Sequence, residues 1–170
     1  CGMSLDEMTN EWIAEPLGMR CTSWRPRPNM SYPDGEPMTG WFTNVRDMAR
    51  LGILVLNDGR WRGRQVVSEG FVREMLTSSQ ADNPAYGLLW WLNGQASYKR
   101  PASPERVAGP LVPSAPMDMV ACLGAADQKI YVLPSWDTVI CRRGGPGLEA
   151  SQTSSSFDEL LWRALSAARV

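Results

Sequence analysis

Apolar residues follow helical spacing in four segments of the chain. The first begins at Ser4, which forms a capping box with Glu7, and Pro16 and Gly18 end it. The other three predicted helices each begin at a residue that can cap a helix, and they span residues 44–57, 68–76 and 156–168. The third is expected to bury four apolar side chains: Phe71, Val72, Met75 and Leu76.

The pattern changes to strand-length apolar runs in the second half of the chain. These runs span residues 86–92, 119–124, 129–133 and 138–142. The connection between the last two is short enough for an antiparallel hairpin. Two proline-rich stretches, residues 21–40 and 94–116, show little periodicity and are predicted to be irregular loops.

This order of elements predicts an α+β fold in which helices pack on an antiparallel sheet. A chain of 170 residues is long enough for one domain. Four strands and four helices, however, leave at least one sheet edge and one helical face without a partner. We therefore interpret residues 1–170 as a single partial domain that another segment or chain completes.

Composition excludes several classes of function. A net charge of −1 gives no electrostatic basis for binding nucleic acid, and no apolar run is long enough to span a membrane. The absence of histidine excludes a Ser-His-Asp triad and any histidine-containing metal site. The four cysteines form no C-x-x-C pair, so neither a metal nor another cofactor is predicted. The compartment stays open between cytoplasm and periplasm or secretion.

The surroundings of two cysteines and both lysines predict whether their side chains are buried. Cys122 and Cys141 lie in apolar strand-like runs and are expected to be buried free thiols. Lys99, in a proline-rich loop, and Lys129, beside a strand, are expected at the surface.

Four stretches, taken together and in order, resemble the β-lactamase and penicillin-binding-protein class of serine hydrolases, which have a DD-peptidase-like fold. They are most similar to the branch that contains 6-aminohexanoate-oligomer hydrolases and related esterases. The stretches are residues 4–19, 40–61, 86–91 and 124–140. The resemblance implies acyl transfer on a small amide, ester or β-lactam substrate.

Such enzymes use a serine and a lysine in a Ser-x-x-Lys motif and a tyrosine in a Tyr-x-Asn motif. Neither motif is present. Ala96 and Ala126 stand three residues before the only two lysines, and no tyrosine is followed two places later by asparagine. The resemblance therefore implies an N-terminal segment or a separate chain that carries both motifs, and this chain alone is expected to be inactive.

The third element of such enzymes is a strand beside the cleft that carries Lys-Thr-Gly or a variant. The matching place here is Cys122-Leu123-Gly124, which lacks the cation and the hydroxyl. By the resemblance, Gly124 borders the substrate and the backbone N–H of Ala125 is the candidate oxyanion donor. Trp41, Trp90 and Trp91 are candidate apolar walls of the substrate cleft, with packing in the core as the alternative for each.

Two other functions stay open at this point. One is a non-catalytic binding or structural module that keeps the same scaffold. The other is an N-terminal nucleophile hydrolase in which Cys1 attacks and its own α-amino group acts as the base.

Overall fold

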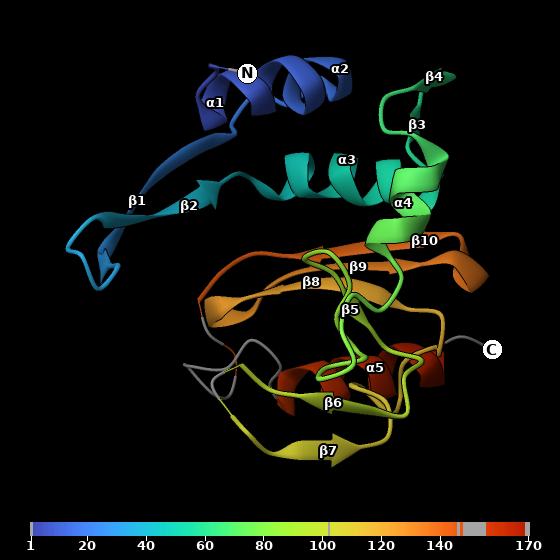
Figure 1. The fold of residues 1–170 in the computed structure, drawn as a ribbon. Helices are drawn as coiled ribbons and strands as arrows, with labels where there is room; N and C mark the ends of the chain where they lie inside the picture. Colours follow the sequence, from blue (N-terminus) through green and yellow to red (C-terminus); the bar gives the residue numbers. More distant parts are fainter. Residues whose placement is uncertain (1, 102, 146, 148–155, 169–170) are drawn as a thin grey trace.

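The computed structural model describes residues 2–101, 103–145, 147 and 156–168, and the elements form layers around a four-stranded antiparallel sheet (Figure 1). Helices α3 (Val45–Leu56) and α4 (Glu69–Met75) lie on one face of the sheet. Helix α5 (Ser156–Ala168) covers the opposite face. The α+β architecture predicted from the sequence is confirmed.

The N-terminal helix is built from three consecutive pieces: α1 (Leu5–Thr9), the π-helical turn η1 (Asn10–Ala14) and α2 (Glu15–Leu17). The predicted capping box is present, because Glu7 N donates to Ser4 Oγ at 3.2 Å and Ser4 N donates to Glu7 Oε2 at 2.7 Å. The wider turn η1 precedes Pro16, whose ring would clash with the carbonyl of an ordinary helical turn. Gly18 ends the helix with a φ of 68°.

The proline-rich stretch 21–40 was predicted to be a loop, and this prediction is wrong. It forms a long hairpin of β1 (Ser23–Ser31) and β2 (Pro37–Phe42), which extends away from the sheet (Figure 1). A two-stranded ribbon has two free edges, so prolines can replace residues whose N–H would point outward. The register shifts between Pro26 and Ser31, where the proline-rich part interrupts pairing.

The buried carboxylate of Asp47 anchors the base of this hairpin to α3. Its Oδ2 accepts hydrogen bonds from Arg20 N at 3.0 Å and Cys21 N at 2.9 Å, and its Oδ1 from Arg50 Nη1 at 2.7 Å. Asn44 caps the same helix by accepting from Asp47 N. The capping turn of α3 therefore also fixes where the hairpin begins.

The predicted helices at residues 44–57 and 68–76 are confirmed as α3 and α4, joined through the short pair β3 (Arg60–Trp61) and β4 (Arg64–Gln65). Val72 is buried and Met75 and Leu76 pack partly against the core, as expected. Phe71 is 47% exposed, which corrects its predicted burial.

The central sheet has the strand order β10-β9-β8-β5. Its strands are β5 (Trp91–Leu92), β8 (Val120–Gly124), β9 (Gln128–Leu133) and β10 (Thr138–Arg142), connected through the 3₁₀ turns η2 (Ala125–Asp127) and η3 (Pro134–Trp136). The last three predicted strands and the hairpin are confirmed. The predicted strand 86–92 is reduced to two residues, because the chain turns back and Tyr86 pairs with Trp91.

The second predicted loop, residues 94–116, contains a small hairpin of β6 (Ser97–Lys99) and β7 (Arg106–Ala108) and is otherwise irregular. Buried Asn93 anchors it, since its side chain accepts from Val112 N at 2.7 Å and donates to the Val112 carbonyl at 3.1 Å. Lys99 is partly exposed and pairs with the surface carboxylate of Asp82.

Two apolar cores lie on the two faces of the sheet. On one face, Trp162 of α5 is fully buried and packs edge-on against Tyr131 and Trp136. On the other, Met48 and Val55 of α3 pack against Ile130 and Val132. Lys129 was predicted to be exposed, and this is wrong: its side chain is 0% exposed among groups that face α5.

Strand β10 is the last strand of the sheet and, among the described residues, only β9 pairs with it. None of the helices among the described residues is both long enough and apolar enough to cross a membrane.

Replacing Gly52 by alanine is expected to lower the free energy of unfolding by about 1–3 kcal/mol, the usual cost of overpacking. A methyl group at Gly52 would lie 2.5 Å from Val139 Cγ1 and 3.1 Å from Ile130 Cγ2. Gly70→Ala in α4 is the matched control, since its methyl group meets no atom within 4 Å. That variant should gain about 0.5–1 kcal/mol from helix propensity. Urea unfolding measures the free energy of unfolding of both variants. Equal changes in the two would contradict the close packing of Gly52 against Val139 and Ile130.

Candidate functional site

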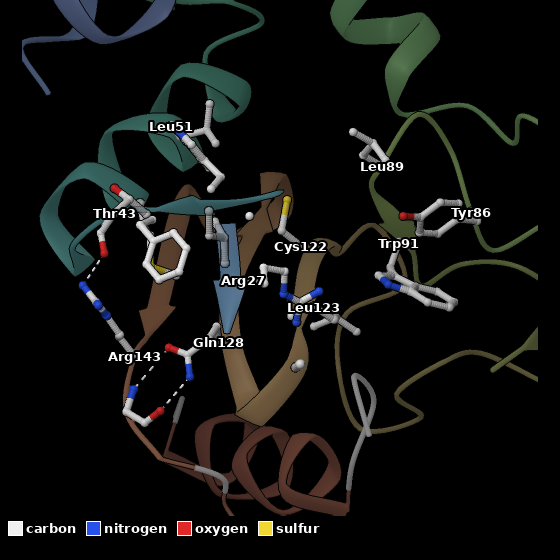
Figure 2. A pocket seen from close by; sticks show the side chains of 18 residues that line it. Arg27, Thr43, Leu51, Tyr86, Leu89, Trp91, Cys122, Leu123, Gln128 and Arg143 are labelled. Atoms are coloured by element: carbon white, nitrogen blue, oxygen red, sulfur yellow. Dashed lines mark hydrogen bonds between the residues drawn. The ribbon is translucent and has the colours of Figure 1, made fainter. Parts of the chain in front are cut away.

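A cavity of about 660 Å³ opens on the α3 side of the sheet (Figure 2). The β1–β2 hairpin, α3, the segment around Tyr86 and the ends of β8 and β10 surround it. Its described lining residues are Arg27, Gly40, Trp41, Phe42, Thr43, Met48, Leu51, Tyr86, Leu89, Trp91, Cys122, Leu123, Gly124, Ala125, Gln128, Ile130, Arg143 and Gly144.

Gly124 and Ala125 lie together at the end of β8, where the strand passes into η2. Ala125 is exposed and is the first residue of this turn, so no hydrogen bond within the turn can satisfy its N–H. Both residues therefore lie where the sequence analysis expected a substrate contact and an anion donor, and their roles stay predictions.

The turn itself has an unusual backbone. Ala126 and Asp127 have φ angles of 55° and 58°. These angles lie in the left-handed region, which residues other than glycine rarely adopt. Gln128 helps to hold this turn on the cavity side. Its Nε2 donates to the Gly144 carbonyl at 2.6 Å (Figure 2) and to the Ala126 carbonyl at 2.8 Å.

The outer edge of β8 is uncovered beside the cavity. Strand β5 pairs only with Val120 and Ala121. Among the described strands, none pairs with Cys122, Leu123 or Gly124 on that side. This leaves a short length of backbone edge to which an extended molecule could hydrogen-bond.

Of the three predicted aromatic walls, Trp41 and Trp91 line the cavity and Trp90 does not belong to its described lining. Trp90 is buried in the core between α3 and α4, which corresponds to the packing alternative. The structure adds Phe42, Tyr86 and the strongly exposed Leu89, which lies on the same side of the cavity as Tyr86 and Trp91 (Figure 2).

The charged side chains in the described lining are both arginines, Arg27 and Arg143. Arg27 projects from the hairpin over the centre of the cavity (Figure 2). Arg143 donates a short hydrogen bond to the carbonyl of Thr43, which joins the end of the hairpin to the end of β10. The described lining therefore offers positive charge to a ligand.

No described lining residue is equipped as a nucleophile. Burial raises the pKa of the Cys122 thiol to about 12, so it stays protonated at neutral pH. Burial also raises the pKa of Tyr86 above its usual value. The Thr43 hydroxyl is hydrogen-bonded to Thr22 Oγ1 at 2.9 Å, and the described lining contains no lysine or carboxylate that could serve as its base.

Sequence reasoning missed Arg27, Phe42, Gln128 and Arg143. Arg27 was assigned to a loop because the prolines around it hid the hairpin. Gln128 and Arg143 lie beside strands that were predicted correctly, but nothing in the local sequence indicates that they face a cavity. Cys1, the attacking residue of the N-terminal nucleophile alternative, lies outside the described residues. No group suited to a metal ion is found within the part of the chain that is described.

Comparisons with known proteins identify the fold. A "putative beta-lactamase" from Bacteroides dorei DSM 17855 matches 99% of this chain with a TM-score of 0.61 at 15% sequence identity. A "putative 6-aminohexanoate-dimer hydrolase" from Bacillus anthracis matches 82% of it with a TM-score of 0.46 at 17% identity. No protein-family model matches the chain, and no curated protein matches it.

The chain therefore has a β-lactamase-like fold. It spans 52% of the length of the Bacteroides protein and 31% of the length of the Bacillus protein.

Proposed function

We propose that this chain forms one side of the active-site cleft of a serine hydrolase that acts on a small ester, amide or β-lactam. In this proposal Ala125 N–H stabilises the oxyanion, and Gly124, Trp41 and Trp91 contact the substrate. The attacking serine comes from a Ser-x-x-Lys motif on an N-terminal segment or another chain, which also carries Tyr-x-Asn.

The observation that carries the proposal is the position of Ala125. In a β-lactamase-like fold, its N–H lies at the cavity end of β8 and has no partner within its own turn. A donor fixed in place before charge develops stabilises a transition state by on the order of 3 kcal/mol. The role needs only backbone, so the loss of the Lys-Thr-Gly side chains does not weaken it.

Two further features support a cleft that is completed by another segment. The described lining supplies walls, positive charge and backbone donors but no activated nucleophile. In addition, the outer edge of β10 has no partner among the described strands. A segment that covers this edge and brings a serine to the cavity would supply both missing parts.

A fluorophosphonate probe tests the proposal, because it phosphonylates the attacking hydroxyl of serine hydrolases, with fluoride as the leaving group. The natural full-length protein should be labelled at the serine of its Ser-x-x-Lys motif, and replacing that serine by alanine should abolish labelling. Residues 1–170 alone should not react.

Labelling of the isolated 170-residue chain would refute the assignment. Absence of labelling in the full-length protein would instead favour a non-catalytic module with the same scaffold.

A further inference from the structure

A fully buried charge cluster lies beneath the turn that carries Ala125. Lys129 Nζ lies 3.2 Å from Asp127 Oδ1 and 3.1 Å from Asp158 Oδ2, and these three side chains are at most 1% exposed. Tyr131, also buried, donates from its hydroxyl to Asp158 Oδ1. Burying charges is costly, and pairing and hydrogen bonds often offset that cost only in part, so the cluster is not explained by a gain in stability alone.

The cluster lies on the opposite side of the turn from the cavity. Side chains alternate along β9, so Gln128 faces the cavity while Lys129 faces α5. Asp127 is the residue of the cluster that belongs to the turn itself. Its carboxylate therefore connects the turn to the layer beneath the sheet.

Asp127 holds the strained turn through contacts of both its carboxylate and its carbonyl. Its Oδ2 accepts from Gly147 N at 2.6 Å, its Oδ1 pairs with Lys129, and its carbonyl accepts from Arg142 Nη1 at 2.8 Å. Two successive residues with positive φ cost about 1–2 kcal/mol each and persist only where the surroundings hold them. These contacts, with those of Gln128 on the other side, fix the turn.

We infer that Asp127 is a positioning residue: its buried carboxylate holds the left-handed turn that aims the Ala125 N–H into the cavity. The inference rests on the proposed function. Asp127 touches no reacting atom and acts through the backbone. Lys129 neutralises this carboxylate, and Asp158 links the ammonium to the first turn of α5.

The test compares Asp127→Asn with Asp158→Asn in the natural full-length protein. Both substitutions remove a carboxylate from the same buried ammonium, but only the first changes a residue of the turn. Asparagine tolerates positive φ, so Asp127→Asn preserves the backbone requirement of the position. For Asp127→Asn we expect kcat for an ester substrate and the rate of fluorophosphonate labelling to fall by about tenfold with KM unchanged, part of the loss that removing a donor causes.

Asp158→Asn should lower the thermal midpoint by a similar amount and change kcat by less than about twofold. A purely structural role predicts equal kinetic effects for the two variants at a temperature where both are folded, and that result would overturn the inference. If Asp127→Asn does not fold, Arg142→Lys replaces it, because lysine loses the guanidinium contacts to the Asp127 and Gly145 carbonyls.

Arg142→Lys should then lower kcat by about threefold without changing KM, and an unchanged kcat would overturn the inference. An unlabelled wild-type protein would be a failure of the proposed function, so the two failures are distinguishable.

Discussion

Replacing Lys129 by methionine should lower the free energy of unfolding by about 3–5 kcal/mol, because it leaves two buried carboxylates without their shared cation. Asp127 and Asp158 are both within 3.2 Å of the ammonium and are as buried as it is. Methionine fills a similar volume, so the lost charge, and not lost packing, should cause most of the change in the free energy of unfolding. Urea unfolding of the natural full-length protein measures the change.

Lys99→Met is the matched control. Lys99 also pairs with an aspartate, but its partner Asp82 is 69% exposed and water screens the pair. We expect a change several-fold smaller than for Lys129. Adding Asp158→Asn to Lys129→Met should recover part of the loss, since one of the two buried carboxylates is then replaced by a neutral amide. Equal losses at the two lysines would contradict the buried cluster.

Alkylation of Cys122 by iodoacetamide at pH 8 should be about 10³-fold slower in the native protein than in the denatured chain, because the thiolate is the reactive form. Burial raises the native pKa of this thiol to about 12, whereas an unfolded cysteine titrates near 8.5. Its native rate should rise about tenfold per pH unit well beyond pH 9, where the denatured chain has reached its plateau.

Cys141 provides an internal comparison, since burial raises its pKa to about 11. It should react faster than Cys122 under native conditions, and site-resolved mass spectrometry separates the two.

The raised pKa values of the two thiols also make the stability of the folded protein depend on pH. The unfolded thiols ionise first, so the contribution of both cysteines to stability is complete below about pH 8.5 and is lost as pH rises toward 11 and 12. Rapid alkylation of Cys122 at pH 8 in the native protein would show that its thiol is not buried and protonated as described.

The elements that could be predicted from the sequence are those that local patterns determine. Ser4, Asn44 and Ser68 cap helices through contacts three residues away. The run from Val120 to Arg142 forms three adjacent strands joined by short turns. In contrast, the prolines of residues 21–40 argued against strands, and only the free edges of a two-stranded ribbon make them acceptable.

The errors at individual residues have equally physical causes. Lys129 was expected to be exposed, because a lysine beside a strand usually reaches water, and its partner Asp158 lies 29 residues away. Nothing local could indicate that contact. Trp90 and Trp91 were both candidates for the cleft wall, with packing in the core as the alternative for each, and adjacent residues in an extended segment point to opposite sides. Trp90 packs in the core with residues of α3 and α4, whereas Trp91 packs in the core on the α5 face and also lines the cavity.

The most direct test of the account is a crystal structure of the natural full-length protein after reaction with a fluorophosphonate. The account predicts that the phosphonyl oxygen lies about 3 Å from the backbone nitrogen of Ala125, with the modified serine reaching the cavity from an N-terminal segment or a second chain. A phosphonyl oxygen held elsewhere, with Ala125 N–H bonded to the protein itself, would contradict it.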